Sequence, residues 1–510
     1  MSNKELNSNK SRIATAIIAG LTGLILLALL VLVLLVPPMS LPVDDEVRNT
    51  TTMTQTVKTM QMYSYCPAKM DLIDTAAYGD VQYSPSKGNI TASSRSSLFG
   101  SVYETQVFHT GDMNSEVQKI NNSQNIDDDN IATETSDVND HSLILHTRLI
   151  DAVSGTGVAS SVASWATEGD LQGLSASSCQ PVSLRQYYMI PKNVEGNSYQ
   201  LIVANPSAKA TSINIRVWGS SQAGELTPAN SSTFVVNAHN EAKLNISAAA
   251  TNQDGLFVSV NSNDTPVASV VRGIHVDGVT ANGNDYITPV AAIKSPVITG
   301  ISSGDSLSAY FYASKNVSAR LYWLTTQGRL DAGNVAIRAH KVAIKSIDKV
   351  PDDAQALLVD SQNVNVYTAA HIEQSGKDNT KDFAVINGKN SVNSGALSIP
   401  DNTSGDLIFA NNSNNNATAV LHSYNSEGTE LKRKTIQLDA YATTSIKLSD
   451  LGDNIAAVML DSNEHISWTL RLSQSDVEQA EVAGVAVIMP TSFVMQSEEV
   501  VTKPDSTIVH

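Results

Sequence analysis

Two short motifs place a serine where nucleophilic chemistry would need one. Gly300-Ile301-Ser302-Ser303-Gly304 matches the G-x-S-x-G pattern. In that pattern a strand, a strained turn and a helix present the serine to a histidine and an acid. Here the motif is followed by SLSAYFYASKN, which has the pattern of a second strand and not of a helix. We therefore interpret 300–304 as a linker between two repeats.

The second motif, Ser84-Pro85-Ser86-Lys87, fits the Ser-x-x-Lys pattern of penicillin-recognising enzymes. In those enzymes the lysine returns to the serine across the first turn of a helix, and SDN and KTG motifs supply the partners. Neither partner motif occurs in this sequence. Ser-Pro followed by Lys-Gly is typical of a turn, which is how we interpret it.

Candidate metal ligands are few. The acidic run 127–129 suggests calcium, but it lacks the glycine and the terminal glutamate of an EF-hand loop. No two histidines have the helical spacing of a zinc hydrolase. His275, His371 and His422 lie in or beside predicted strands, where a hydrogen-bonded or exposed histidine is the ordinary case. We expect no metal, no cofactor and no catalytic residue.

The chain has only two cysteines, Cys66 and Cys179. In an oxidising compartment such a pair normally forms a disulfide, the alternative being two reactive thiols. The bond would close a loop of more than a hundred residues, which stabilises the fold by about 4 to 5 kcal/mol in the chain-entropy model. We predict a structural disulfide.

The longest apolar stretch is Ile13–Val36, 24 residues without a charge. About 20 such residues span a bilayer as a helix. The alternative is a cleaved signal peptide, whose apolar region is about 7 to 15 residues long and ends in small residues. We favour a permanent anchor. Basic residues precede the run and mainly acidic residues follow it, which predicts a cytoplasmic N-terminus and puts residues 37–510 outside the membrane.

Composition excludes some partners. The formal net charge of −17 would repel nucleic acid and anionic lipid surfaces. Aromatic content is low, and the many Asn, Ser and Thr residues suit turns between short strands. We expect no nucleic-acid partner, and contact with the membrane only through the N-terminal helix.

A repeat of about a hundred residues emerges when the chain is compared with itself. Three copies each hold short strand-like runs with β-branched residues, and a turn recurs in them as Asn261-Ser262-Asn263, Asp360-Ser361-Gln362 and Asp461-Ser462-Asn463. These turns lie 99 and 101 residues apart. We predict that each joins two strands as a hairpin, and that each copy closes with one more strand, at 285–290, 382–387 and 482–490.

The same pattern predicts a mainly β fold, namely an N-terminal transmembrane helix followed by tandem antiparallel β-sandwich (Ig-like) modules. Trp218, Trp323 and Tyr424 recur on one strand of the copies, either as core residues, which we favour, or as a ligand-stacking platform. The expected segments are a tail at 1–12, the helix at 13–36, a stalk at 37–60, a disulfide-tied β-rich segment at 61–180, sandwich repeats at 181–290, 291–390 and 391–490, and a tail at 491–510.

Three segments of the sequence carry a resemblance to a known group of proteins. They are Tyr65-Cys66-Pro67, Cys179-Gln180-Pro181-Val182, and Leu201–Pro206 followed by alternating strands. The pattern resembles an uncharacterised family of actinobacterial envelope proteins with an N-terminal anchor and a large exported part. The resemblance implies export and a β-rich fold, and it supplies no catalytic residue.

These features suggest two classes of function. The first is a membrane-anchored, extracytoplasmic envelope protein that acts as a non-enzymatic scaffold or binding module for cell-wall glycan or other envelope proteins. Repeated sandwiches whose loops and edges serve recognition favour this hypothesis. The alternative is an accessory component of a hydrolase or transferase system for cell-wall polysaccharide. It would need two carboxylates converging in one cleft.

Overall fold

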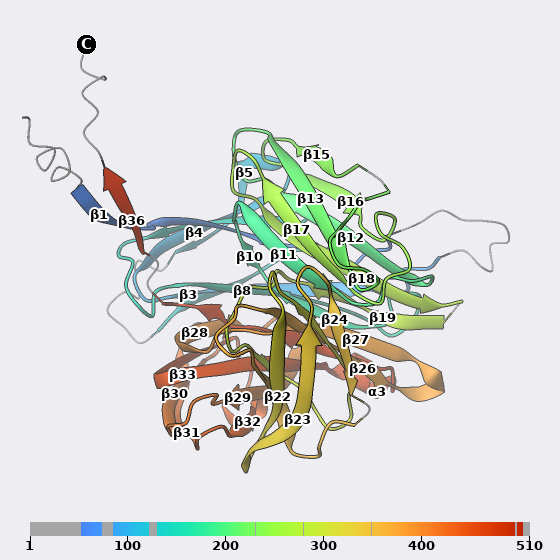
Figure 1. Ribbon diagram of the computed structural model, residues 1–510. Coiled ribbons are helices and arrows are strands. Elements are labelled where there is room, and N and C mark those ends of the chain that lie inside the picture. The colour runs from blue at the N-terminus through green and yellow to red at the C-terminus, as the bar shows by residue number, and fades with distance from the viewer. Residues whose placement is uncertain are drawn as a thin grey trace, which may run out of the picture. The chain divides into compact units, whose positions relative to one another are not determined.

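The computed structural model describes residues 53–73, 85–121, 130–229, 231–278, 280–347, 349–494 and 497–502 (Figure 1). The chain divides into two compact units. One is a body of residues 58–496, and the other combines 1–57 with 497–510. In the second unit, β1 (Met53–Lys58) pairs with β36 (Ser497–Thr502), so parts of the predicted stalk and tail form strands. The rest of this section concerns the body.

The strands of the body fall into four consecutive modules, which we name N, R1, R2 and R3. Module N contains β2 (Gln61–Cys66), β3 (Thr91–Phe99), β4 (Val102–His109), β5 (Asp112–Asn121), β6 (Ala132–Ser136), β7 (Leu143–Leu149), β8 (Gly157–Ala166), β9 (Gly173–Ser178) and β10 (Gln180–Pro181). Module R1 contains β11 (Arg185–Ile190), β12 (Asn197–Ala204), β13 (Thr211–Gly219), β14 (Glu225–Leu226), β15 (Thr233–Val236), β16 (Glu241–Asn245), β17 (Leu256–Ser262), β18 (Ala268–Asp277) and β19 (Thr280–Ile287).

The other two modules are built in the same way. Module R2 contains β20 (Val297–Thr299), β21 (Ser306–Tyr312), β22 (Val317–Thr325), β23 (Gly328–Ile337), β24 (Ala343–Ile347), β25 (Ala354–Asp360), β26 (Tyr367–Ser375) and β27 (Lys381–Asn387). Module R3 contains β28 (Val392–Ser398), β29 (Thr403–Ala410), β30 (Ala417–Tyr424), β31 (Glu430–Leu438), β32 (Thr443–Lys447), β33 (Ala457–Gln474), the short helix α3 (Ser475–Gln479), β34 (Ala486–Ile488) and β35 (Thr491–Ser492).

All four modules share one strand order. In R2, one sheet runs β20-β25-β22-β23 and the other β24-β21-β26-β27. The corresponding pairs are β2-β7-β4-β5 with β6-β3-β8-β9, β11-β17-β13-β14 with β16-β12-β18-β19, and β28-β33-β30-β31 with β32-β29-β33-β34. All the strand pairs are antiparallel, as expected. The segment 61–180, predicted only as β-rich, is therefore a fourth copy of the fold.

The recurrent turns do not form hairpins, so that prediction is wrong. Strands β17 and β18 flank the first turn and lie in different sheets, and so do β25 and β26 around the second. The third turn lies inside β33, whose first part pairs with β30 and whose last part pairs with β29. The serine of the turn helps to bend the chain from one sheet to the other: the Ser262 hydroxyl donates to the Thr265 carbonyl at 2.6 Å.

The resemblance segment Leu201–Pro206 also has a structural reason. Asn205 is 1% exposed, and its Nδ2 donates to the Lys209 carbonyl at 2.7 Å while its Oδ1 accepts from the Ser207 amide. Asn411 makes the same two bonds in R3, to the Asn415 carbonyl and from the Ser413 amide. A buried asparagine thus closes the loop that follows the second strand of both modules.

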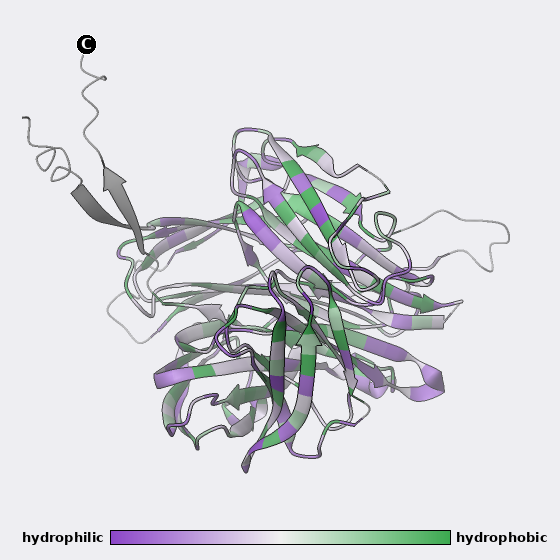
Figure 2. Cartoon of the chain, in the orientation of Figure 1, coloured by the Kyte–Doolittle hydropathy of each residue, from purple (hydrophilic) through white to green (hydrophobic). Residues whose placement is uncertain are grey.

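Alternating side chains build the module cores. In β13, Ile213, Ile215 and Val217 face inward and are at most 3% exposed, whereas Arg216 is exposed. Figure 2 shows the matching alternation of hydrophobic and hydrophilic residues along β13. This period of two is what one covered face requires.

The three recurrent aromatics are buried, with Trp218 7% exposed, Trp323 4% and Tyr424 5%, but only Trp323 is confirmed as a core residue between the two sheets of its own module. They pack in two different places. Trp323 lies in the core between the two sheets of R2. Trp218 packs against Tyr312 of R2, and Tyr424 packs edge-on to Phe99 of module N. Two of the three therefore join neighbouring modules.

Contacts between modules close a cycle. The sheet that holds a module's first strand packs on the other sheet of the next module: β2 contacts β18, β11 contacts β26, β20 contacts β29, and β28 contacts β8 of module N. Aromatic and charged pairs reinforce these interfaces. Phe257 of R1 stacks on Tyr312 of R2 with the ring centroids 3.8 Å apart. Arg471 of R3 forms an ion pair with the buried Asp305 of R2, and its Nη2 lies 2.7 Å from Oδ1.

Some predictions fall outside the described residues. These are the anchor Ile13–Val36, Ser84 of the Ser-x-x-Lys motif, and the acidic run 127–129. Within the described part of the chain, no helix has both the length and the apolar character of a membrane span.

Candidate functional site

The closing strands of the four modules meet at the centre of the cycle. β9 contacts β19, β19 contacts β27, β27 contacts β34, and β34 contacts β9. We call these four the axial strands. Each is the edge strand of its sheet in the paths described above, so its outer side faces the equivalent strands of the neighbouring modules.

Asp382 ties the beginnings of the axial strands together. Its Oδ2 accepts the amide N–H of Leu174 at 2.9 Å and that of Val485 at 2.9 Å, and its Oδ1 accepts that of Asn284 at 3.2 Å. The three donors belong to module N, R3 and R1, and the carboxyl group belongs to R2. One side chain therefore hydrogen-bonds to all three of the other modules.

Two glycines make room for this carboxyl group. Gly173 and Gly283 immediately precede the donors Leu174 and Asn284, with φ of +129° and +98°. A Cβ added to Gly283 would lie 2.5 Å from Oδ1 of Asp382, and one added to Gly173 would lie 2.7 Å from it. Only glycine fits both the backbone conformation and this close approach.

Burial raises the pKa of Asp382 to about 8, although the backbone N–H groups that it accepts act in the opposite direction. A second buried carboxyl group lies beside it. Asp285 accepts the Val385 amide at 2.8 Å, and burial raises its pKa well above the ordinary value. Both carboxyl groups are held by backbone amides, which indicates a structural role.

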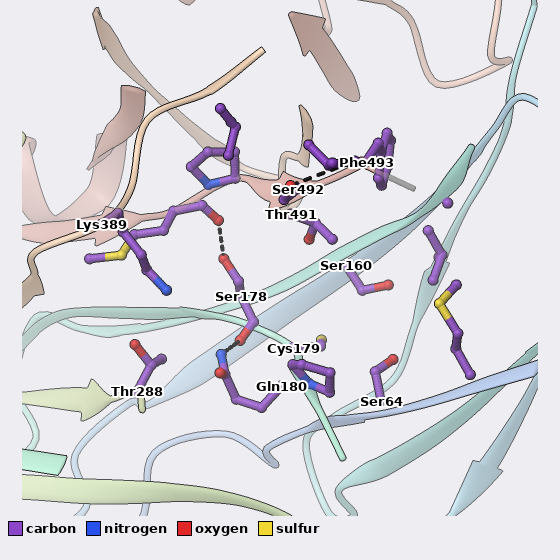
Figure 3. Close-up of a pocket in the computed structure, with 18 of the residues that line it drawn as sticks. Ser64, Ser160, Ser178, Cys179, Gln180, Thr288, Lys389, Thr491, Ser492 and Phe493 are labelled. Carbon is purple, nitrogen blue, oxygen red and sulfur yellow. Dashed lines mark hydrogen bonds between the residues drawn. The ribbon is translucent and has the colours of Figure 1, made fainter. Parts of the chain in front are cut away.

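A cavity of about 640 Å³ opens beyond the other end of the axial strands (Figure 3). Every axial strand contributes to the lining of the cavity. The first lining residue of each strand lies two or three positions after Asp382 or after the residue whose amide bonds to Asp382. These first lining residues are Ala176, Tyr286, Val385 and Val487. Residues of β2, β8, β33 and the segments around them also contribute to the wall. The cavity is thus made by all four modules.

Lys389 is the only charged residue in the described lining of this cavity. It follows β27, and Figure 3 shows its side chain reaching into the cavity, with Phe493 on the other side. Burial lowers the pKa of Lys389. Among the described residues, no carboxylate pairs with its ammonium group.

Hydroxyl groups supply most of the remaining polar lining, and several of them bond within the wall. The Ser178 hydroxyl donates to the Met489 carbonyl across the boundary between module N and R3. Nδ2 of Asn387 donates to the Thr288 carbonyl at 2.9 Å across the boundary between R2 and R1. These bonds fix the ends of the axial segments around the cavity.

The predicted disulfide is present and borders the cavity. Cys66 and Cys179 are joined, with their Cα atoms 4.4 Å apart and a sequence separation of 113. Cys66 ends β2 in one sheet of module N, and Cys179 follows β9 in the other. The bond therefore links an axial strand to the opposite sheet of its module.

The described residues of the two serine motifs have local structural roles. Segment 300–304 joins β20 to β21 inside R2, so it is a loop within one module and not a linker between two. There the Ser302 amide donates to the Asp305 carboxylate at 2.8 Å. Lys87 pairs with Asp71 at 2.5 Å, and the Ser86 amide donates to Asp170.

The three histidines noted in the sequence lie apart from the cavity lining. His275 bonds the Tyr199 hydroxyl at 2.6 Å and stacks on Phe383, and His422 bonds Glu430 at 2.7 Å. His371 is buried near His275, and its Nε2 has no hydrogen-bond partner. Within the described residues, no three potential ligands cluster as a metal site would require.

Sequence reasoning missed Asp382 and Lys389. A faint signal is present: Gly173, Gly283 and Gly484 occupy matching positions in or just before three closing strands, whereas the fourth has Asp382 there. A lone acid entering the apolar run FAVI is unusual in a strand buried on both sides. The sequence alone could not show that the four strands meet.

Fold and site together define a class: a mainly β protein of repeated antiparallel sandwiches, closed around an axial cavity. The chain matches the model of a family of unknown function, DUF5719, over residues 132–449. It therefore belongs to that family. The match includes three axial strands with Asp382 and Lys389 and ends before β34. A comparison with curated proteins found no match.

Proposed function

We propose that this chain is a membrane-anchored protein of the actinobacterial cell envelope, and that its body is a non-enzymatic binding module. Its partner would be an envelope component, either a cell-wall constituent or another envelope protein. Support comes from the apolar run Ile13–Val36, the acidic composition and the disulfide, which is typical of oxidising compartments.

The axial cavity is the observation that carries the binding role. Its volume of about 640 Å³ lies within the usual range for small-molecule sites, roughly 300 to 1,000 Å³. The wall is formed by segments of four modules pinned to each other by hydrogen bonds. A cavity that is preformed in this way lowers the cost of binding, because little ordering is needed when the ligand enters.

The alternative, an accessory component of a polysaccharide hydrolase or transferase system, would call for two accessible carboxyl groups in one cleft. The two carboxyl groups with raised pKa at the centre of the body, Asp285 and Asp382, are both buried and accept backbone amides. Their geometry favours the binding module.

Two measurements test the proposal with the full chain. The first is protease accessibility of the body in intact cells and after lysis, where we expect cleavage at the outer face without lysis. The second is native mass spectrometry of the chain purified from its membranes, where we expect a bound small molecule that denaturation releases. A body found in the cytosol, or one that never carries a ligand, would contradict the proposal.

A further inference from the structure

The electrostatic character of the axial cavity differs from that of the whole chain. The protein carries a net charge of −17, but no Asp or Glu belongs to the described lining, and the single charge there is the ammonium of Lys389. The cavity is therefore a positive site within an acidic protein. An anion that enters meets one cation and no lining carboxylate.

The backbone holds Lys389 firmly in this place. Its amide donates to the Val297 carbonyl at 3.0 Å, and its carbonyl accepts the Val297 amide at 3.1 Å. The segment between β27 and this bridge includes Gly388, where an added Cβ would lie 2.1 Å from the Thr368 hydroxyl. A tight local fit thus fixes the direction in which the lysine side chain leaves the wall.

An unpaired ammonium group in such a place is costly, because it has lost much of its water without gaining a partner. Burial lowers the pKa of Lys389 for the same reason. Oxygen atoms of a carboxylate or phosphate would restore hydrogen bonds and compensate the charge. The lysine is therefore suited to receive the head group of an anion.

The rest of the wall suits an apolar body. Phe493 lies across the cavity from Lys389 in Figure 3, and the wall also includes Met62, Val153 and Trp468. Hydroxyls such as those of Ser64 and Ser160 also belong to the lining. An apolar ligand surface that covers these side chains would be removed from water, which favours binding in proportion to its area.

We propose that the axial cavity binds an amphipathic anion, with a carboxylate or phosphate head against Lys389 and an apolar body toward Phe493. This inference rests on the proposed binding role and adds the class of the ligand. The same head groups occur on free fatty acids and on phosphorylated lipids, so the experiment must separate carboxylate from phosphate.

The test is calorimetric titration of the full chain in phosphatidylcholine nanodiscs. The probes are decanoate, decyl phosphate, the neutral decan-1-ol, and inorganic phosphate alone. Wild type is compared with Lys389→Met and Lys389→Arg. Lys315→Met is the matched control, because Lys315 is exposed and lies outside the cavity lining. Partition of the probes into the bilayer is common to all variants and cancels in the comparison.

We expect at least one of the two amphipathic anions to bind wild type and Lys315→Met equally, and to bind Lys389→Met at least about tenfold more weakly, a factor equal to 1.4 kcal/mol. Lys389→Arg should retain most of the affinity. Decan-1-ol should bind all variants alike, and inorganic phosphate should bind far more weakly than decyl phosphate. The better anion identifies the head group.

Equal affinity of both anions for wild type and Lys389→Met would overturn the inference. If decan-1-ol still bound, the cavity would remain a ligand site and only the anion assignment would fall. If inorganic phosphate bound as tightly as decyl phosphate, the proposed contact between an apolar ligand body and the cavity wall would be refuted. Failure of every probe to bind would refute the ligand class, whereas native mass spectrometry judges the binding role independently.

Discussion

The two ends of the axial strands use the same framework in opposite ways. At their beginnings, the buried Asp382 accepts amides from three other modules, so its hydrogen-bonding capacity is used inside the protein. Just beyond their ends, Lys389 reaches into a cavity and has no ion-pair partner among the described residues. Four equivalent strands therefore create one internally satisfied site and one open site.

This difference separates a structural role from a binding role on physical grounds. Removal of a satisfied buried group leaves its partners orphaned, which destabilises the fold. Removal of an unpaired, desolvated charge leaves nothing orphaned. We therefore expect substitutions at the Asp382 end to change stability, and substitutions at Lys389 to change binding.

The largest effect should follow Asp382→Ala. The change leaves the buried amides of Leu174, Asn284 and Val485 without acceptors, each at about 1 to 3 kcal/mol. We expect the free energy of unfolding of the full chain to fall by at least about 3 kcal/mol in urea denaturation. Asp352→Ala, at an exposed position, is the control and should change stability by less than about 0.5 kcal/mol. A loss of similar size in Asp382→Ala and Asp352→Ala would show that the Asp382 carboxyl group does not hold the modules together.

Gly283→Ala should come next, because its Cβ would lie 2.5 Å from the Asp382 carboxylate. Gly224→Ala is a close control, since Gly224 has φ of +102° against +98° but nothing within 4 Å of an added Cβ. Both variants suffer the backbone strain, and only the first meets a clash. The loss of unfolding free energy should exceed that of the control by about 1 to 3 kcal/mol. Equal losses would show that Asp382 is not packed there.

The pH dependence of stability gives a third, smaller test. The pKa of Asp382 is about 8 in the folded body and near 3.8 when unfolded, so the folded state holds the extra proton. Stability should therefore fall as pH rises through that interval. The buried His371, with its pKa lowered to about 4, acts in the opposite direction below its ordinary pKa of 6.5.

Between about pH 6.5 and 8 the two buried carboxyl groups should dominate, because the pKa of Asp285 is raised as well and acts in the same direction as that of Asp382. Wild type should lose unfolding free energy across this window, as urea titrations at successive pH values would measure. Asp382→Asn does not titrate and should show a shallower slope. The same slope in both proteins would assign the pH dependence to other groups.

The smallest expected effect on stability is that of Lys389→Met. Because the ammonium group has no ion-pair partner, its removal should leave the free energy of unfolding unchanged or raise it, within about 1 kcal/mol. Thermal and urea unfolding of the ligand-free protein would measure this. A clear loss of stability would show that Lys389 supports the fold, and the contrast between the two ends would then fail.

The sequence predicted the parts of this structure that depend on local pattern. Strand alternation such as Ile213, Ile215 and Val217 predicts antiparallel sandwiches, and a single pair of cysteines predicts the Cys66–Cys179 bond. Module N escaped detection as a copy because it lacks the recurrent serine turn. Asn and Asp at a turn predict a hairpin, but the same residues are equally suited to a bend between sheets.

The central junction could not be predicted because it depends on contacts between distant segments. Asp382 and Leu174 are 208 residues apart in sequence, and no local pattern indicates that this carboxyl group meets that amide. The sequence does not distinguish Lys389 from the other lysines, because its place in the cavity depends on how the four axial strands meet. Such convergence depends on tertiary structure, which periodicity does not encode.

Amide hydrogen exchange of the full chain, with and without Asp382→Ala, is the most direct test of the junction. The amides of Leu174, Asn284 and Val485 belong to three different modules but share one acceptor. We predict strong protection of all three in wild type and a joint loss of protection in the variant. Independent exchange of the three amides, or protection that survives the substitution, would contradict the account.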